Sequence, residues 1–240
     1  MTILKKLYDK SAVLFAVFFI VAYCFFMSLG DALSELLVIA YVFSLPISLC
    51  LSALILCFLK KYELFRVYGI CRSKLGKREM LFYLPFIVLL TANTWNGLKL
   101  NFGITETFLY IFTMLFVGFL EEIIFRGFLF DAMRKDGEGL AIAVSSITFG
   151  MGHIINLLNG AELLPTLLQL VYAAAAGFMF VAVFIKSKSL VPCIVTHGLF
   201  NALGAFSVEN KTQEMQIISC AVLTVISVAY GFYLLKKINR

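Results

Sequence analysis

Charged residues are scarce in this sequence of 240 residues, of which Asp, Glu, Lys and Arg together make up only 14%. Typical soluble domains contain about 25% charged residues, so this chain has too little polar surface to cover a globule in water. It also has too little charge for a disordered protein. Apolar residues instead reach 62%, including 25 Phe, and the mean hydropathy is +0.97. This composition predicts an all-α, polytopic membrane protein.

The sequence also lacks any C-x-x-C spacing, although it contains six cysteines. Most of them lie inside apolar runs, so we expect small packing residues rather than disulfides or a thiolate metal site. The net charge of +6 does not indicate nucleic-acid binding, because the basic residues recur in short clusters between apolar runs, which is typical of membrane-flanking charge. The first apolar run is too long for a signal peptide, so we expect a retained first span.

A helix needs about 20 apolar residues to cross a bilayer core of about 30 Å. Eight segments are predicted to cross, of which the third and seventh are the weakest because polar residues dilute them: about 11–29, 36–59, 80–96, 104–130, 139–158, 163–185, 189–206 and 215–235. We find no repeat, linker or low-complexity segment, which favours a single domain over residues 1–240, with its motifs between about 104 and 206.

The distribution of basic residues predicts the orientation. Seventeen of the 20 Lys and Arg residues fall before the first span or in the segments after the second, fourth, sixth and eighth spans. Only Lys99 and Lys211 lie on the other side, and Arg126 lies within a span. By the positive-inside rule, both termini and the segment from Lys60 to Arg78 are expected in the cytoplasm. An even number of spans is consistent with that placement.

Ionisable residues at membrane depth are costly to insert and are functional candidates by default. The fourth predicted span contains Glu121, Glu122 and Arg126, and the fifth contains Phe149 and His153. The seventh contains His197 and Asn201, so both histidines of the chain lie in these spans.

Helical spacing places several of these side chains on common faces. Glu122 and Arg126 are four residues apart and can pair, whereas Glu121 is turned by about 100° and has no such partner in its own helix. At about 1.5 Å per residue, Glu121 lies roughly 20 Å from Arg134, and His197 lies roughly 14 Å from Lys188. His153 is similarly about 21 Å deep, so the three side chains are expected to meet near the middle of the membrane.

A purely structural reading of these residues is also open. The two glutamates and the arginine can form an intramembrane ion-pair network, and a lone His or Asn in a membrane helix often serves as a hydrogen-bonding contact between helices. Contacts between helices alone would not require so many polar side chains in the membrane, each of which is costly to insert. Here an unpaired carboxylate, two histidines and an asparagine lie at matched depth on three helices. Their conjunction favours a functional site. The small residues from Ala173 to Gly177 are interpreted as packing residues that allow close helix approach.

The motifs E-E-x-x-x-R, F-x-x-x-H and H-x-x-x-N, in this order on successive apolar segments, resemble the type II CAAX prenyl endopeptidase family. This family, also called CPBP or Abi, comprises glutamate-dependent intramembrane peptidases and includes bacteriocin-immunity proteins. The resemblance implies that Glu121 activates water with the help of His153, and that His197 and Asn201 stabilise the oxyanion. It also implies that Glu122, Arg126 and Phe149 shape the site, that a peptide bond is hydrolysed without a covalent intermediate, and that no cofactor is required.

Rival chemistries remain open. Glu121, His153 and His197 would supply the three protein ligands usual at a catalytic zinc site, although no H-E-x-x-H motif is present. Cys193 and His197 lie four residues apart and would allow a cysteine dyad. No G-x-S-x-G motif supports a serine hydrolase.

Non-enzymatic functions and the partners are also open. The same residues would suit a transporter, a proton path, or a membrane protein that provides immunity or binds a partner without catalysis. The expected partners are the lipid bilayer and a peptide or protein substrate, lipidated or not, with no nucleic acid. Short loops favour a bacterial plasma-membrane protein.

Overall fold

The computed structural model describes residues 2–75, 79, 83–208 and 212–238. Apolar composition and few helix breakers give long helices, and within these ranges the chain forms no strand beyond an isolated bridge between Leu98 and Ser207. The α-helices are α1 (Thr2–Lys10), α2 (Ala12–Leu36), α3 (Ser44–Lys61), α4 (Leu84–Thr91), α5 (Ile104–Glu121), α6 (Phe130–Met133), α7 (Glu138–Gly152), α8 (Ile155–Leu158), α9 (Leu163–Ser187), α10 (Val191–Ala202) and α11 (Gln213–Ile238).

Six helical segments of the described chain are long and apolar enough to cross a membrane, which confirms the polytopic all-α prediction. They are Ala12–Leu36, Ser44–Lys61, Ile104–Asp136, Glu138–Leu158, Leu163–Ser187 and Gln213–Lys236. The two remaining predicted spans correspond to shorter apolar helices, Leu84–Thr94 and Val191–Phe206. These are the third and seventh segments, in which polar residues dilute the apolar run. Residues 80–82 of the third predicted span lie outside the described residues.

The boundary between the first two spans was predicted wrongly. The second helix was expected from residue 36, but α2 continues to Leu36 and α3 begins only at Ser44. The intervening turn contains two residues with positive φ, Val38 and Tyr41. Ser34 closes this turn, because its hydroxyl accepts a hydrogen bond from the backbone N–H of Phe43 at 3.0 Å. The turn is apolar in composition, so hydropathy did not reveal it.

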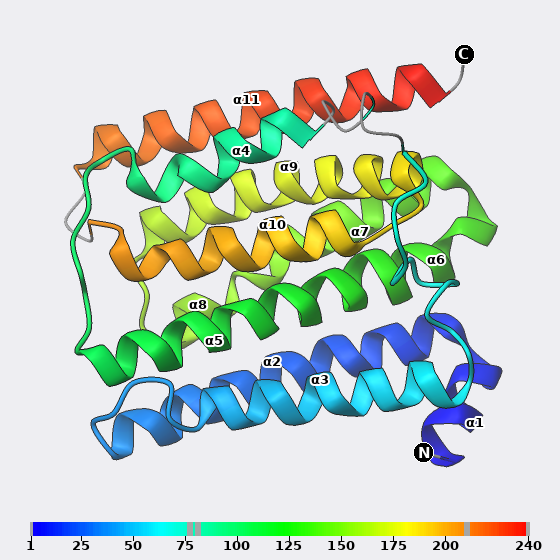
Figure 1. The fold of residues 1–240 in the computed structure, drawn as a ribbon, viewed down its shortest axis with the longest axis horizontal. Coiled ribbons are helices and arrows are strands. Elements are labelled where there is room, and N and C mark those ends of the chain that lie inside the picture. Colours follow the sequence, from blue (N-terminus) through cyan, green and yellow to red (C-terminus); the bar gives the residue numbers. More distant parts are fainter. Residues whose placement is uncertain (1, 76–78, 80–82, 209–211, 239–240) are drawn as a thin grey trace.

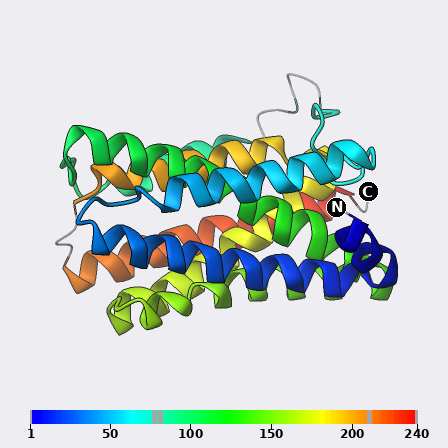
Figure 2. The ribbon, with the colours of Figure 1, turned by 90° about the horizontal axis from the view of Figure 1, so that it is seen from below.

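The long helices lie side by side, with α4 and α11 at one edge of the bundle and α2 and α3 at the other (Figure 1). Seen from below, α3, α5 and α10 form one layer and α2, α7, α9 and α11 form a second (Figure 2). Helix α5 packs between α3 and α10, and α9 packs between α7 and α11. The continuation of α5 beyond Glu121 crosses toward α2 and α7, so it links the two layers.

Both termini lie at one end of the bundle (Figure 1). We call this the basic end, because it carries α1, the chain after α3, the turn after α6 and the turn after α9, with their Lys and Arg residues. The opposite end carries the turns 37–43, 95–103, 159–162 and 203–208. Lys77, Arg78, Lys211 and Arg240, which entered the orientation argument, lie outside the described residues, as does the side chain of Lys237.

Candidate functional site

The two adjacent glutamates lie where α5 changes its hydrogen-bonding pattern. Helix α5 ends at Glu121, and Glu122–Leu129 continues it as a π-helix in which every residue is buried. π-helical turns inside longer helices are frequent at functional sites. The sequence did not predict the π-helical turns, since the residues around Glu122 and Arg126 are those of an ordinary apolar helix. The wider turn places Glu122 and Arg126 in the space between the two layers of helices.

Two glycines set how closely α5 approaches α10. A Cβ added to Gly118 would lie 2.5 Å from the backbone nitrogen of Gly198, a distance that real Cβ atoms do not tolerate. The two helix backbones are therefore in direct contact at this crossing. Because His197 immediately precedes Gly198 and Glu121 lies three residues after Gly118, this close approach brings the imidazole ring to the glutamates.

The imidazole ring of His197 lies between the two carboxylates. Its Nδ1 is 2.8 Å from Oε1 of Glu122, and its Nε2 is 3.3 Å from Oε2 of Glu121. His197 and the two glutamates are all buried, and Glu121 is 8% exposed whereas Glu122 is fully buried. A neutral imidazole donates from only one nitrogen. The two contacts are both favourable when the ring carries both protons or when a proton is shared with a carboxylate.

Arg126 offsets the charge of one of the two glutamates, Glu122. Its Nη1 lies 3.2 Å from Oε1 of Glu122, and both side chains are fully buried, which confirms the predicted pair. The guanidinium also lies over the Phe149 ring, 3.9 Å from the ring centroid, a geometry in which the ring face attracts the cation. Gly177 of α9 leaves room for it, because a Cβ there would lie 2.9 Å from Nη2. The small residues of α9 therefore accommodate a charged side chain as well as a neighbouring helix.

His153 directly follows α7 and caps its end. Its Nδ1 lies 3.1 Å from the carbonyl oxygen of Phe149. A carbonyl only accepts, so Nδ1 donates in this contact, and Nε2 can accept a hydrogen bond when the ring is neutral. The ion pair of Glu121 goes to His197 rather than to His153. His153 and Glu121 instead line the same cavity.

This cavity has a volume of about 350 Å³, and Asn201 also lines it. The backbone around Asn201 is fixed from two sides: Tyr110 donates its hydroxyl to the Asn201 carbonyl at 3.1 Å, and Asn93 donates its side-chain amide to the Phe200 carbonyl at 2.6 Å. The structure thus brings Glu121, His153 and Asn201 to one cavity, with His197 beside Glu121. The predicted meeting of the three helices is observed; what each residue does there stays a prediction.

The sequence reasoning missed Tyr23. Its hydroxyl donates to Oε1 of Glu121 at 2.7 Å across 98 positions of sequence, and it also lines the cavity. Glu121 therefore has partners from two other helices, α2 and α10. A tyrosine within an apolar run follows no spacing pattern. The one available sign of a role for Tyr23 was that it places a hydroxyl inside the first span.

Two rival chemistries can be compared with this geometry. Cys193 is fully buried, and its thiol lies 3.5 Å from the carbonyl oxygen of Phe180, while both nitrogens of His197 face glutamates. A thiol–imidazole dyad thus gains no support. Across the residues that the structure covers, no three His, Cys, Asp or Glu side chains are grouped so that they could hold a metal ion. The six cysteines, all described, are free thiols.

Residues 103–203 match the family model described as Rce1-like, type II CAAX prenyl endopeptidase Rce1-like. This match confirms the resemblance to that family and covers every predicted site residue, from Glu121 to Asn201. Together with the apolar helices, it supports a multi-pass membrane protein with protease chemistry. Tyr23 lies outside the matched segment. A comparison with curated proteins found no match.

Proposed function

We propose that this chain, which carries an Rce1-like segment, is an intramembrane endopeptidase that hydrolyses a peptide bond of a membrane-associated peptide or protein. The observation that supports this best is the placement of Glu121. Its carboxylate borders a cavity, accepts a hydrogen bond from Tyr23 and lies 3.3 Å from His197. The family match supports the protease class; the glutamate-based mechanism is our own proposal.

Glu121 acts as the general base in this proposal. It takes a proton from a water molecule, whose oxygen then attacks the carbonyl carbon of the peptide bond. His153 assists, because the free Nε2 of its neutral ring can accept a hydrogen bond and hold that water in place. The proton on Glu121 then passes to the nitrogen of the leaving amine as the carbon–nitrogen bond breaks. No covalent bond to the protein forms.

Asn201 stabilises the negative oxygen of the tetrahedral intermediate. Both ring nitrogens of His197 face glutamates, so the oxyanion role that the resemblance implies for His197 is not part of this proposal. The Asn201 amide can donate into the cavity, and a donor aimed at a developing oxyanion is worth more in surroundings of low polarity than in water. His197 lies beside Glu121 and connects the base to the buried Glu122–Arg126 pair. Glu122, Arg126 and Phe149 shape the site by fixing the position of the His197 ring, which contacts Phe149 at 5.6 Å between ring centroids.

Three further points belong to the proposal. The reaction needs no metal, since Glu121 and His153 act on water directly. Residues 1–240 act as one domain, because Tyr23 from outside the matched segment contacts Glu121. The basic end lies in the cytoplasm of what we take to be a bacterial cell, since the positive-inside rule places clustered Lys and Arg there.

The alternative in which these residues line a transport path receives less support from the packing. Between Glu121 and the basic end, the π-helical residues are buried, and the rings of Phe15, Phe19 and Phe128 lie 4.9–5.4 Å apart. A binding or immunity protein that does not cleave remains a distinct outcome of the experiment below.

The test compares peptides released by cells that carry the wild-type chain, Glu121→Gln or Glu214→Gln, using mass spectrometry. Glu121→Gln removes the base while nearly preserving its shape, so peptides that depend on cleavage should disappear while the protein stays in the membrane. Glu214 is an exposed glutamate in the first turn of α11, so the same change there should leave the peptides unaltered. A general base typically contributes about 10²–10⁴-fold to the rate. The purified Glu121→Gln protein should therefore cleave at least about 10²-fold more slowly than the wild type.

Cleavage by Glu121→Gln at the wild-type rate would contradict the proposal. A phenotype that survives Glu121→Gln while no peptide changes would favour the binding or immunity function instead.

A further inference from the structure

We call the cavity of about 350 Å³ beside Glu121 the catalytic cavity, and among the described residues its lining leads toward one end of the bundle. Its inner part is lined by Tyr23, Glu121 and His153, and its outer part by Asp31 and Asn159. Asp31 lies near the end of α2, and Asn159 follows α8, so both belong to the opposite end. From Glu121, the lining therefore leads away from the basic end.

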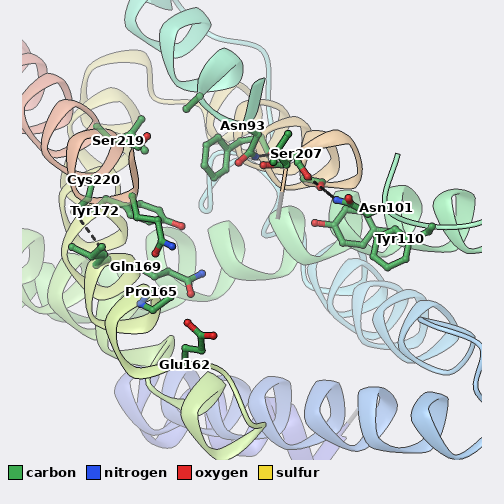
Figure 3. Close-up of a pocket in the computed structure, with 18 of the residues that line it drawn as sticks. Asn93, Asn101, Tyr110, Glu162, Pro165, Gln169, Tyr172, Ser207, Ser219 and Cys220 are labelled. Atoms are coloured by element: carbon green, nitrogen blue, oxygen red, sulfur yellow. Dashed lines mark hydrogen bonds between the residues drawn. The ribbon is translucent and has the colours of Figure 1, made fainter. Parts of the chain in front are cut away.

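Two further cavities continue this space at the same end. One, of about 610 Å³, shares Asn93, Gln169 and Tyr172 with the catalytic cavity. Figure 3 shows Gln169 and Tyr172 of α9, with Glu162 just before that helix, on one side of it and Asn93, Ser207 and Asn101 on the other. The other, of about 560 Å³, shares Asp31, Asn156 and Asn159 with the catalytic cavity. The common lining residues place the three cavities next to one another, between Glu121 and the opposite end of the bundle.

The route toward the basic end is filled by aromatic packing. Phe125, Phe128 and Leu129 follow Glu121 along the chain and are at most 4% exposed. The Phe128 ring packs against Phe15 at 5.0 Å and against Tyr68 at 4.9 Å between centroids. A peptide approaching from this end would have to displace part of the main hydrophobic core.

The lining of the open route suits a peptide. Amide side chains such as Asn93, Asn156 and Gln169 can both donate to and accept from a peptide backbone. No lysine or arginine among the described residues lines any of the three cavities, whereas Asp31 and Glu162 do. The charges of the lining therefore favour a neutral or cationic segment over an anionic one.

We propose that the substrate reaches Glu121 from the opposite end, as an extended, neutral or basic peptide segment on the extracytoplasmic side of the membrane. This inference rests on the proposed function and on the basic end being cytoplasmic. It makes the substrate a peptide or an extracytoplasmic segment of a membrane protein, rather than a chain terminus presented from the cytoplasm. The cut is then made on the side of the membrane from which a product can leave the cell.

Native cysteines allow a test that does not depend on activity. Cys24 lines the catalytic cavity, and Cys71 lies at the basic end, where its thiol is 3.5 Å from the Lys188 carbonyl. One variant keeps only Cys24, a second keeps only Cys71, and a third carries Ser28→Cys as its only thiol, with alanine replacing the other cysteines. Ser28 lines the same cavity one helical turn nearer to the opposite end, so it covers the case that the Cys24 thiol reacts slowly.

The three variants are treated, in intact spheroplasts and after permeabilisation, with a small trimethylammonium thiosulfonate reagent that does not cross membranes. Labelling is read by mass spectrometry. We expect Ser28→Cys and Cys24 to be labelled in intact spheroplasts. Cys71 should react there at least tenfold more slowly than either, and it should be labelled fully only after permeabilisation.

Labelling of Cys24 and Ser28→Cys only after permeabilisation, or in neither condition, would overturn the inference, and so would labelling of Cys71 in intact spheroplasts. Labelling as expected, combined with unchanged peptides in Glu121→Gln cells, would leave the route standing and reject the peptidase function.

Discussion

The Tyr23 hydroxyl donates to Glu121 at 2.7 Å, so the first long helix of the chain contacts the proposed base directly. This contact fixes one carboxylate oxygen and leaves the other facing His197. Because residues of two other helices, α2 and α10, contact Glu121, its carboxylate keeps its orientation toward the cavity. Tyr23 is therefore a positioning residue in our proposal, although it lies outside the segment that matches the family model.

Tyr23→Phe tests that role. Hydrogen bonds to charged groups contribute about 1.5–3 kcal/mol, so we expect kcat for the Glu121-dependent peptides to fall by roughly 10- to 100-fold with little change in KM. The matched control is Tyr68→Phe, which removes a hydroxyl bonded to Tyr8 at 3.1 Å, far from the cavity. An equal loss in both variants would refute a specific role for Tyr23.

Local spacing predicted part of this site and missed the rest for a physical reason. Glu122 and Arg126 were predicted to pair because side chains four residues apart share a helix face, and they do. The contact of Glu121 with Tyr23 joins residues 98 positions apart, which no single-sequence periodicity encodes. The π-helix at Glu122–Leu129 was missed because its residues, apart from Glu122 and Arg126, are those of an ordinary apolar helix.

The spans were predicted better than the site because hydropathy acts over whole segments. The third and seventh segments, flagged as weak for their polar residues, are the two short helices. Those polar residues are also the ones with positional tasks: Asn93 in the third holds the Phe200 carbonyl, and His197 in the seventh contacts both glutamates. In this protein, the two weakest segments among the predicted spans therefore both carry residues of the site.

Glu122→Gln is expected to lower stability more than any other single change at the site. It leaves Arg126 buried without its ion-pair partner, and breaking a buried pair in this way costs about 3–5 kcal/mol. Arg134 and Glu138 offer a matched control, since they form an ion pair of the same spacing at 3.8 Å on the surface. Exposed pairs are worth about 0–1 kcal/mol, so Glu138→Gln should leave the melting temperature in detergent nearly unchanged. Equal melting temperatures for the two variants would contradict the buried-pair account.

Asn201→Ala should affect the chemical step. Removing one oxyanion donor typically costs about 10²–10³-fold in kcat, and KM should change less, because the interaction strengthens only in the transition state. Its backbone contacts to Tyr110 and its neighbour's contact to Asn93 do not involve the deleted amide, so the melting temperature should be retained. A rise in KM with unchanged kcat would assign Asn201 to substrate binding instead.

Chelation decides between the proposed mechanism and a zinc enzyme. If Glu121 and His153 act on water directly, dialysis against a strong zinc chelator should leave cleavage nearly intact, and elemental analysis should find no stoichiometric zinc. Cys193→Ala serves as the parallel test of the thiol dyad and should cleave like the wild type. Activity that vanishes on chelation and returns specifically with zinc would establish the metal mechanism.

Gly118→Ala should separate helix approach from chemistry, because it alters no polar group of the site. The added Cβ would lie 2.5 Å from the backbone of Gly198, and backbone cannot move aside as a side chain can. Helices α5 and α10 must separate, which draws the His197 ring away from both glutamates. We expect a loss of cleavage of at least tenfold together with a lower melting temperature, since overpacking typically costs about 1–3 kcal/mol.

The matched control is Gly139→Ala, also in a helix, where an added Cβ meets nothing within 4 Å. Alanine favours a helix over glycine by about 1 kcal/mol, so this control should be at least as stable as the wild type and equally active. If Gly118→Ala also cleaves at the wild-type rate, then the contact between His197 and Glu121 is not required for the reaction, and the base must act through Tyr23 and His153 alone.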